Sequence, residues 1–177
     1  GKTVKLSGII MAINRMSFGE LIHLEKGLKA FFHKLDDIGV RSNLVDYTFQ
    51  NSGTLYDGLS ALIDHIRSNY ANSFYSVSQG VSETTVIVTN KLKAEMTSLF
   101  QQELLLSQRE HVSAITLMLP RENRQLYGIY YYILRELAWR GINLVELIST
   151  SNEFTVIVTN QDLNEAFAIL SDLRKRS

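Results

Sequence analysis

The hexapeptide TVIVTN occurs twice in this chain of 177 residues, at 85–90 and at 155–160. The two copies lie 70 residues apart. A shift of 70 also aligns three flanking residues of each copy: Gly58 with Gly128, Ile63 with Ile133, and Glu83 with Glu153. A repeat that extends beyond the identical run indicates that one structural unit is present twice.

The residues around each hexapeptide predict the same order of elements. Alternating apolar residues predict a half-buried strand, and an apolar stripe with helical spacing follows it. Two more strands and a closing helix complete the unit. The predicted ranges are 43–49, 55–70, 73–79, 84–89 and 91–105 in the first copy, and 113–119, 125–140, 143–149, 154–159 and 161–174 in the second. Each unit therefore has the order β-α-β-β-α, which is the split β-α-β plan.

The first 40 residues differ from the repeat and predict helices. Ser7 can open a short helix over 7–16, and Ser17 with Glu20 fits a capping box. An apolar stripe then runs to a predicted helix end at Gly39. The predicted organisation is a helical segment over 1–40, which we expect to be the end of a trimmed domain, followed by units at 41–108 and 109–177.

The overall composition narrows the function classes. Lys plus Arg and Asp plus Glu both number 18, so the chain lacks the basic surplus typical of nucleic-acid binding. The absence of Cys excludes disulfides and thiolate chemistry, and no apolar run reaches the ~20 residues of a membrane span. The four His are scattered, so no metal or catalytic set is expected. We expect a cytoplasmic protein that is not an enzyme and has no cofactor. Because the chain opens at Gly1, a preceding domain is also expected.

The run GIYYYILRELAWRGINLVELISTSNEFTVIVTNQDLNEAFAIL at 128–170 resembles an ACT domain. More narrowly, it resembles the regulatory ACT pair at the C-terminal end of aspartate kinases. The first unit resembles the same family less strongly, through NSFYSVSQGVSETTVIVTNKLKAEMTSLF at 72–100, and residues 1–40 lie outside the resemblance. The chain carries no Gly-rich phosphate loop or other nucleotide motif of a kinase.

The resemblance implies an α+β fold of two ferredoxin-like βαββα(β) units packed together, and an allosteric module that binds a small amino acid. It places the ligand between the first strand–helix loop of one unit and strand two of a partner. A helix N-terminus with unpaired N–H groups suits a carboxylate. The implied ligand-binding residues of the second unit are Arg121, Asn123, Tyr127, Gly128, Ile129 and Asn143. Those of the first unit are Asn51, Gly53, Gly58 and Ser73.

Two features leave other functions open. The loop at 119–132 is longer, more charged and more aromatic than the family pattern, and Arg121 and Arg124 could hold a carboxylate there. Its tyrosine run could instead pack in an interface, which favours a ligand-free dimerisation module. Residues 105–110 are a candidate fourth strand for the first unit, but the second unit has none after its last helix. Such an open edge favours a homodimer. A third alternative is the regulatory half of a transcription regulator that lacks its DNA-binding domain.

Overall fold

A computed structural model of the chain describes residues 26–175. A helix over 26–32 comes first. The elements that follow are β1 (Ile38–Gln50), α3 (Leu55–Asn69), β2 (Tyr75–Gln79), β3 (Glu83–Thr89), η1 (Asn90–Leu92), α4 (Lys93–Leu99), β4 (Leu105–Met118), η2 (Arg121–Gln125), α5 (Ile129–Trp139), β5 (Glu146–Ser149), β6 (Glu153–Thr159) and α6 (Leu163–Asp172).

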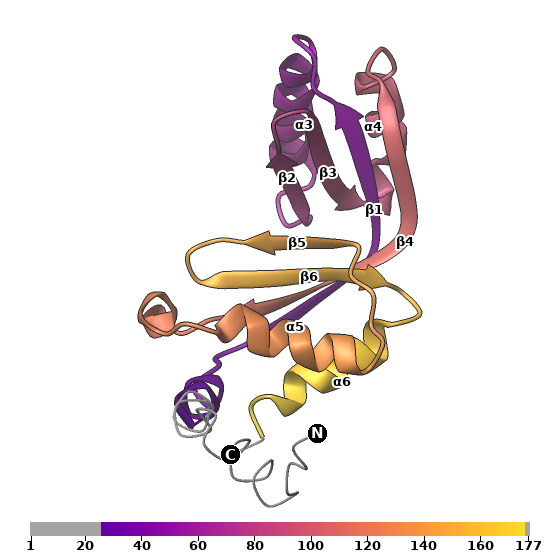
Figure 1. The fold of residues 1–177 in the computed structure, drawn as a ribbon. Helices are drawn as coiled ribbons and strands as arrows, with labels where there is room; N and C mark the ends of the chain where they lie inside the picture. Colours follow the sequence, from indigo (N-terminus) through magenta and orange to yellow (C-terminus); the bar gives the residue numbers. More distant parts are fainter. Residues whose placement is uncertain (1–25, 176–177) are drawn as a thin grey trace, which may run out of the picture.

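All six strands join one antiparallel sheet in the order β2-β3-β1-β4-β6-β5. The strands β1 and β4 pass from the upper half of the molecule into the lower half, and they pair with each other in both halves (Figure 1). Helices α3 and α4 cover one face of the upper half, and α5 and α6 cover one face of the lower half (Figure 1). The predicted α+β fold of two ferredoxin-like units is confirmed.

The fourth strand of each half is part of one of the two long strands, β1 or β4. Residues 105–110 belong to β4 and pair with β1, so the predicted fourth strand of the first unit is confirmed. The prediction that the second unit has no fourth strand was wrong. Residues 38–41 of β1 pair with 114–117 of β4 and complete that unit from the N-terminal side. The prediction considered only the sequence after the last helix, whereas this strand precedes the first repeat.

The strand pairing suggests a division of the chain that differs from cuts at 40 and 108, because β1 and β4 cross those points without a break. We propose that unit one consists of residues 44–111, and that unit two consists of the strand 38–41 together with 112–175. In this division the two units are interleaved, and each of the two long strands belongs to both.

A corner separates the two units within β1 and β4. Asn43 and His111 both have left-handed backbones, with φ of 60° and 58°. The strand register shifts on both sides of Leu44, by one extra residue of β1 and then by one extra residue of β4. Such bulges bend strands and increase their twist. The two bulges lie where unit one turns over the helix-free face of unit two.

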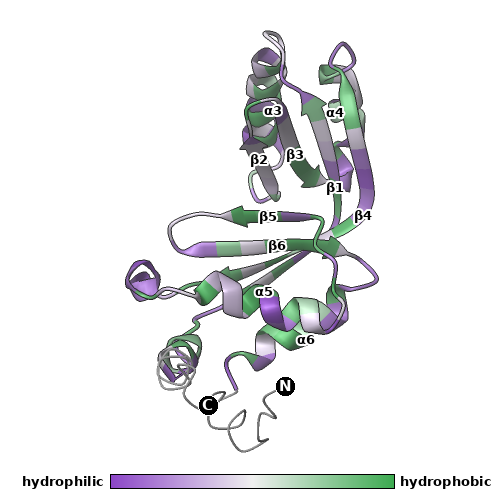
Figure 2. Ribbon diagram, in the orientation of Figure 1, coloured by the Kyte–Doolittle hydropathy of each residue, from purple (hydrophilic) through white to green (hydrophobic). Residues whose placement is uncertain are grey.

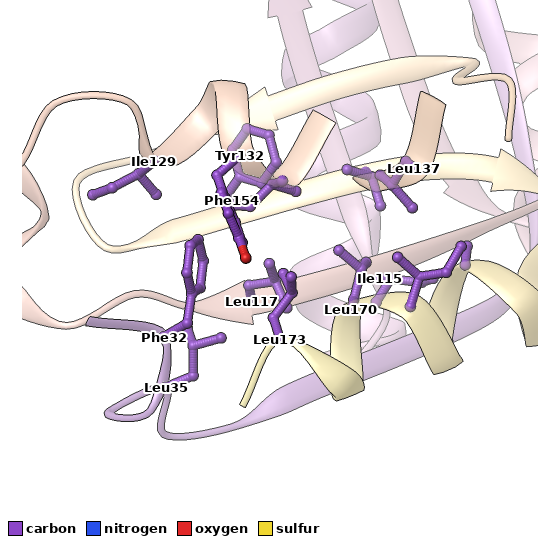
Figure 3. Close-up of a cluster of buried hydrophobic side chains, with 14 of the residues drawn as sticks. Phe32, Leu35, Ile115, Leu117, Ile129, Tyr132, Leu137, Phe154, Leu170 and Leu173 are labelled. Carbon is purple, nitrogen blue, oxygen red and sulfur yellow. The ribbon is translucent and has the colours of Figure 1, made fainter. Parts of the chain in front are cut away.

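Each unit has its own helix-covered core. In unit one, apolar residues of β1 and β3 pack under α3 and α4. In unit two, β4 and β6 pack under α5 and α6, and Phe32 and Leu35 of the N-terminal segment close the same cluster beside Leu117 and Leu173 (Figure 3). A third cluster fills the corner between the units: Leu44, Ile87, Val112, Ala114 and Ile157. In Figure 2, hydrophobic stretches (green) recur along the strands and helices, whereas the loop before α5, which contains η2, is mostly hydrophilic (purple).

The N-terminal prediction is confirmed only in part. Residues 26–32 are helical, but the helix ends there and not at Gly39, which lies within β1. Apolar residues at helical spacing continue past the true end because Leu35 still packs into the core of unit two. The predicted helix over 7–16 and the capping box at Ser17 lie outside the described residues.

The repeat holds, with one correction to its alignment. Leu44 pairs with Thr89 and Val112 pairs with Thr159, so the first strands correspond at a shift of 68 and not 70. The loops that follow differ in length, at 51–54 and 119–128, and α3 begins a turn earlier than α5 relative to the later strands. The closing helices are shorter than predicted, at Lys93–Leu99 and Leu163–Asp172.

Candidate functional site

A cavity of about 560 Å³ opens at the N-terminal end of α5 in unit two. The long loop after β4, the first turn of α5 and the β5–β6 hairpin form its walls. The lining residues are Asn123, Arg124, Leu126, Tyr127, Gly128, Ile129, Tyr130, Tyr131, Thr150 and Ser151. Eight of these ten residues lie within 119–132, the stretch that departs from the family pattern.

The start of α5 leaves backbone donors available to a ligand. Gly128 is the N-cap residue with φ of 85°, a left-handed conformation that glycine adopts at little cost. Within the described residues, no side chain caps this helix and no acidic residue lies in its first turn. The first N–H groups of a helix lack intrahelical partners and carry the positive end of its dipole. The cavity is therefore suited to an anionic group.

Asn123 connects the long loop to the hairpin. Its Nδ2 donates a hydrogen bond of 2.6 Å to the backbone oxygen of Ser151, and its backbone N–H donates to the oxygen of Pro120. Its Oδ1 is buried without a hydrogen-bond partner among the described residues. A buried acceptor of this kind costs about 1–3 kcal/mol when it stays unpaired.

Aromatic side chains frame the mouth of the cavity. Tyr130 stacks on Phe154 with ring centroids 4.9 Å apart, and its hydroxyl lies 3.0 Å from the Ser149 hydroxyl. Tyr127 is 77% exposed and Tyr131 is 64% exposed. These two rings offer apolar area with a polar tip, which suits either a ligand side chain or a protein partner.

The matching helix end in unit one is already occupied by the chain itself. The backbone N–H of Leu55 donates to the Ser52 hydroxyl, and the hydroxyls of Ser52 and Thr54 donate to the carboxylate of Glu103. These hydrogen bonds hold the pKa of Glu103 below its usual value. Unit one thus has a carboxylate of its own chain beside the start of α3. In unit two, no acidic residue lies in the first turn of α5.

The structure brings together four of the six residues predicted for the second unit. Asn123, Tyr127, Gly128 and Ile129 line the cavity. The exposed Arg121 is not among the lining residues, whereas Arg124 is. Asn143 is exposed beyond the other end of α5, away from the helix N-terminus.

The four residues predicted for the first unit do not meet. Asn51 and Gly53 precede α3, whereas Ser73 follows its C-terminal end. Asn51 fixes the β2–β3 turn, because its Nδ2 donates to Gly80 and its Oδ1 accepts from Thr84.

Gly58 lies within α3 and not at its N-cap. A Cβ there would lie 3.0 Å from the ring of Phe100, so this glycine allows α4 to pack closely against α3. The alignment with Gly128 therefore matches two glycines that occupy different places in their helices.

Sequence reasoning missed Thr150 and Ser151, which form the hairpin wall of the cavity. Their signal was present as a polar run, STSNE, between two predicted strands. A hairpin tip packs near the first strand–helix loop of the same unit in both halves, as the backbone hydrogen bonds from Asn51 to Ser82 and from Leu119 to Asn152 demonstrate.

The described residues also bear on metal binding and on membrane insertion. Within residues 26–175, no cluster of three or more His, Asp or Glu side chains could hold a metal ion. Over the same part of the chain, no helix combines the length and apolar character that crossing a membrane requires.

No protein-family model matches the sequence, and no curated protein matches it by sequence. Solved structures do share the fold. A structure of aspartokinase alpha and beta subunits is 16% identical, with a TM-score of 0.62, over 80% of this chain and 99% of that one. The regulatory subunit of aspartate kinase from Thermus thermophilus, in its ligand-free form, is 8% identical, with a TM-score of 0.61, over 78% of this chain and 97% of that one.

Escherichia coli aspartokinase III, in complex with lysine and aspartate, is 12% identical, with a TM-score of 0.54. The match covers 80% of this chain and 32% of that one, so the chain spans about a third of that kinase. At these identities the likeness establishes the fold. The predicted resemblance to the regulatory ACT pair of aspartate kinases is therefore confirmed at the level of the fold, and the Thermus thermophilus match is a regulatory subunit.

Proposed function

We propose that this chain is an allosteric regulatory module that binds a free amino acid at the N-terminal end of α5. The observation that carries the proposal is the contrast between the two units. In unit one, the hydroxyls of Ser52 and Thr54 beside the start of α3 donate to the carboxylate of Glu103, whereas in unit two the start of α5 lines a cavity of about 560 Å³. An internal carboxylate at one copy is the chemical model for a ligand carboxylate at the other.

The cavity suggests how an amino acid would bind. The carboxylate of the amino acid accepts hydrogen bonds from the first-turn N–H groups of α5, where the helix dipole stabilises negative charge. Its ammonium lies beside Asn123 on the long loop. Its side chain extends toward Leu126 and Tyr127 at the mouth. In this proposal the site at a helix start lies in unit two.

The matched proteins support regulation more than catalysis. The matches include regulatory subunits of aspartate kinase, and one matched aspartokinase was solved with lysine and aspartate. In this proposal the chain is not an enzyme and passes a conformational change to a partner. The effector must favour one of two arrangements of the module, because a ligand that binds both equally shifts nothing. A cytoplasmic location stays a prediction.

A dimerisation module is the second candidate function, and the surface of α5 favours it. Tyr131 and Trp139 lie eight residues apart on this helix, Tyr127 directly precedes its N-cap, and Trp139 is 75% exposed. The guanidinium of Arg135 lies 4.9 Å from the Trp139 ring. In addition, β2 and β5 are the two edge strands of the sheet. A homodimer would cover such surfaces with or without a ligand.

Thermal unfolding against each of the twenty amino acids at millimolar concentration tests the proposal. A ligand that binds only the folded state raises the unfolding midpoint. Ser151→Asp should abolish the rise, because it puts a carboxylate on the hairpin wall of the cavity. Ser82→Asp makes the same change on the hairpin of unit one and should leave the rise intact.

Two results would count against amino-acid binding. One is an unchanged midpoint with all twenty amino acids. The other is a rise that Ser151→Asp leaves in place. If the chain is also a dimer by sedimentation under these conditions, the dimerisation function becomes the better account.

A further inference from the structure

A second cavity lies on the opposite side of the sheet of unit two. Strand alternation directs Ile115 and Leu117 of β4 toward the helices, so Thr116 and Met118 face the other way. Unit one folds over this helix-free face at the corner. Close to the corner, apolar side chains fill the space. Farther from the corner, a cleft of about 360 Å³ remains.

Both units contribute to this cleft. Its floor consists of strands of unit two, including Thr116 of β4 and Thr155 of β6. Its other wall is the start of β2 in unit one, at Phe74, Tyr75 and Ser76. The cleft shares only Thr150 with the cavity at α5. A molecule bound here would therefore contact both units and would occupy a site different from that of the proposed effector.

Gly39 keeps the cleft open. It pairs with Thr116 across β1 and β4, and a Cβ built on it would meet no atom within 4 Å. Its backbone is not in the left-handed region, since Gly128 and Gly141 are the glycines with positive φ among the described residues. The backbone thus does not require glycine at this strand position. The consequence of glycine here is empty space between the units.

The polar groups of the cleft carry charges of both signs. Arg41 lies two residues after Gly39 on the same strand face, and its Nη1 donates to the backbone oxygen of Val40. Asp37 and Glu153 bring two carboxylates. No ion pair joins these three side chains within residues 26–175. Their charge therefore remains available to a ligand.

Hydroxyl groups complete the floor. Thr116 and Thr155 are hydrogen-bonded to each other at 2.7 Å. One hydroxyl hydrogen forms that bond, and the second hydroxyl hydrogen of the pair can still be donated. A carboxylate placed between Arg41 and this pair gains charge-assisted hydrogen bonds. One carboxylate of the cleft would balance the α-ammonium of the same molecule, and the other would balance a second positive group.

We propose that the cleft between the two units is a second binding site, and that it takes a zwitterionic amino acid with a positively charged side chain. With two carboxylates against one guanidinium, the cleft favours a ligand of net positive charge. Binding here joins β2 of unit one to the sheet of unit two, so it stabilises one relative position of the units. The inference rests on the proposed function only in supposing that the chain responds to free amino acids.

Calorimetric titration of the full chain with L-lysine tests this site, with L-norleucine as a ligand of similar size that lacks the second ammonium. We expect L-lysine to bind more tightly than L-norleucine by roughly tenfold or more, because one charge-assisted contact is lost. Gly39→Val fills the cleft with a residue that strands tolerate well, and it should abolish lysine binding. Glu153→Gln should weaken lysine binding by roughly tenfold.

Matched variants separate this site from the cavity at α5. Glu83→Gln changes the corresponding glutamate of unit one, outside the cleft, and should leave lysine affinity unchanged. Ser151→Asp should also leave it unchanged. The inference is overturned if L-lysine does not bind, or if Gly39→Val binds it as the unaltered chain does. Lysine binding that Ser151→Asp removes and Gly39→Val retains would support the proposed function and refute the second site.

Discussion

Asp46 is the buried carboxyl group of the corner between the two units. It is 6% exposed on β1, opposite Arg109 of β4. Its pKa is raised from 3.8 to about 6: burial is the largest cause, the charge of Glu146 also raises it, and the charge of Arg109 partly offsets both. Strand alternation marked the apolar positions 45, 47 and 49 correctly but gave no sign that position 46 would be covered by a second unit.

The raised pKa predicts a stability that falls as pH rises. The folded state holds the proton of Asp46 more tightly than the unfolded state, so its contribution is fully present below about pH 4 and is lost as pH rises through about 6. Asp46→Asn should remove this loss. It should raise the free energy of unfolding at pH 8 by up to about 3 kcal/mol and change it little at pH 4.

Urea denaturation of both proteins at pH 4 and pH 8 measures the difference. Glu83→Gln is a suitable control, because it replaces an exposed carboxylate of unit one. An Asp46→Asn variant that is equally or less stable than the unaltered chain at pH 8 would contradict the account of the corner.

At the scale of single residues, the sequence predicted the lining of the cavity at α5 only for residues close to Gly128. Gly128, Asn123, Tyr127 and Ile129 meet because a helix start and its preceding loop are local in sequence. Asn143 did not join them, since the loop from α5 to β5 lies at the far end of an 11-residue helix. Local spacing identifies what surrounds a helix end but not which distant hairpin packs beside it.

The two long strands β1 and β4 determine how the units are joined. Their bulges place Asn43 and His111 in left-handed conformations, which cost little for glycine and about 1–2 kcal/mol for most other residues. Asparagine and histidine enter this region more readily than β-branched residues do. The corner thus uses residue types that tolerate it.

Substitutions at Asn43 test whether the left-handed corner contributes to stability. Asn43→Val should lower the free energy of unfolding by about 1–2 kcal/mol, because a β-branched residue is strained there. Asn43→Gly should be close to neutral. Ser42→Val, at the neighbouring residue without positive φ, is the control. Guanidinium denaturation gives the three values, and equal losses for Asn43→Val and Asn43→Gly would argue against a conformational cause.

At the element scale, the sequence predicted the strand and helix order because periodicity is local. It did not predict that β1 would serve both units, because pairing of 38–41 with 114–117 joins segments far apart in the chain. The helical stripe also continued past the true helix end at 32, since Leu35 is buried by tertiary packing outside a helix.

At the scale of the whole molecule, the interleaved units predict that unit two cannot fold from the second repeat alone. A fragment of 109–177 lacks the strand 38–41 as well as Phe32 and Leu35, all of which complete its sheet or core. We expect this fragment to lack cooperative thermal unfolding, whereas 26–177 should retain it. Circular dichroism melting compares the two fragments.

A synthetic peptide of residues 26–42 provides the control for the fragment experiment. Added to 109–177, it should restore a cooperative transition, because it supplies the missing strand and helix. A fragment 109–177 that melts cooperatively without the peptide would show that the second repeat is self-sufficient, and the proposed division would be wrong.

The central claim is that an amino acid binds with its carboxylate on the first turn of α5. The most direct measurement is a titration of the ¹⁵N-labelled full chain with a mixture of the twenty amino acids, followed through the backbone amide signals. Binding at this helix start should give the largest shifts at Ile129, Tyr130 and Tyr131, with smaller shifts at Ser151 and none at Leu55, whose N–H already donates to Ser52. Unchanged signals throughout the first turn of α5 would contradict it.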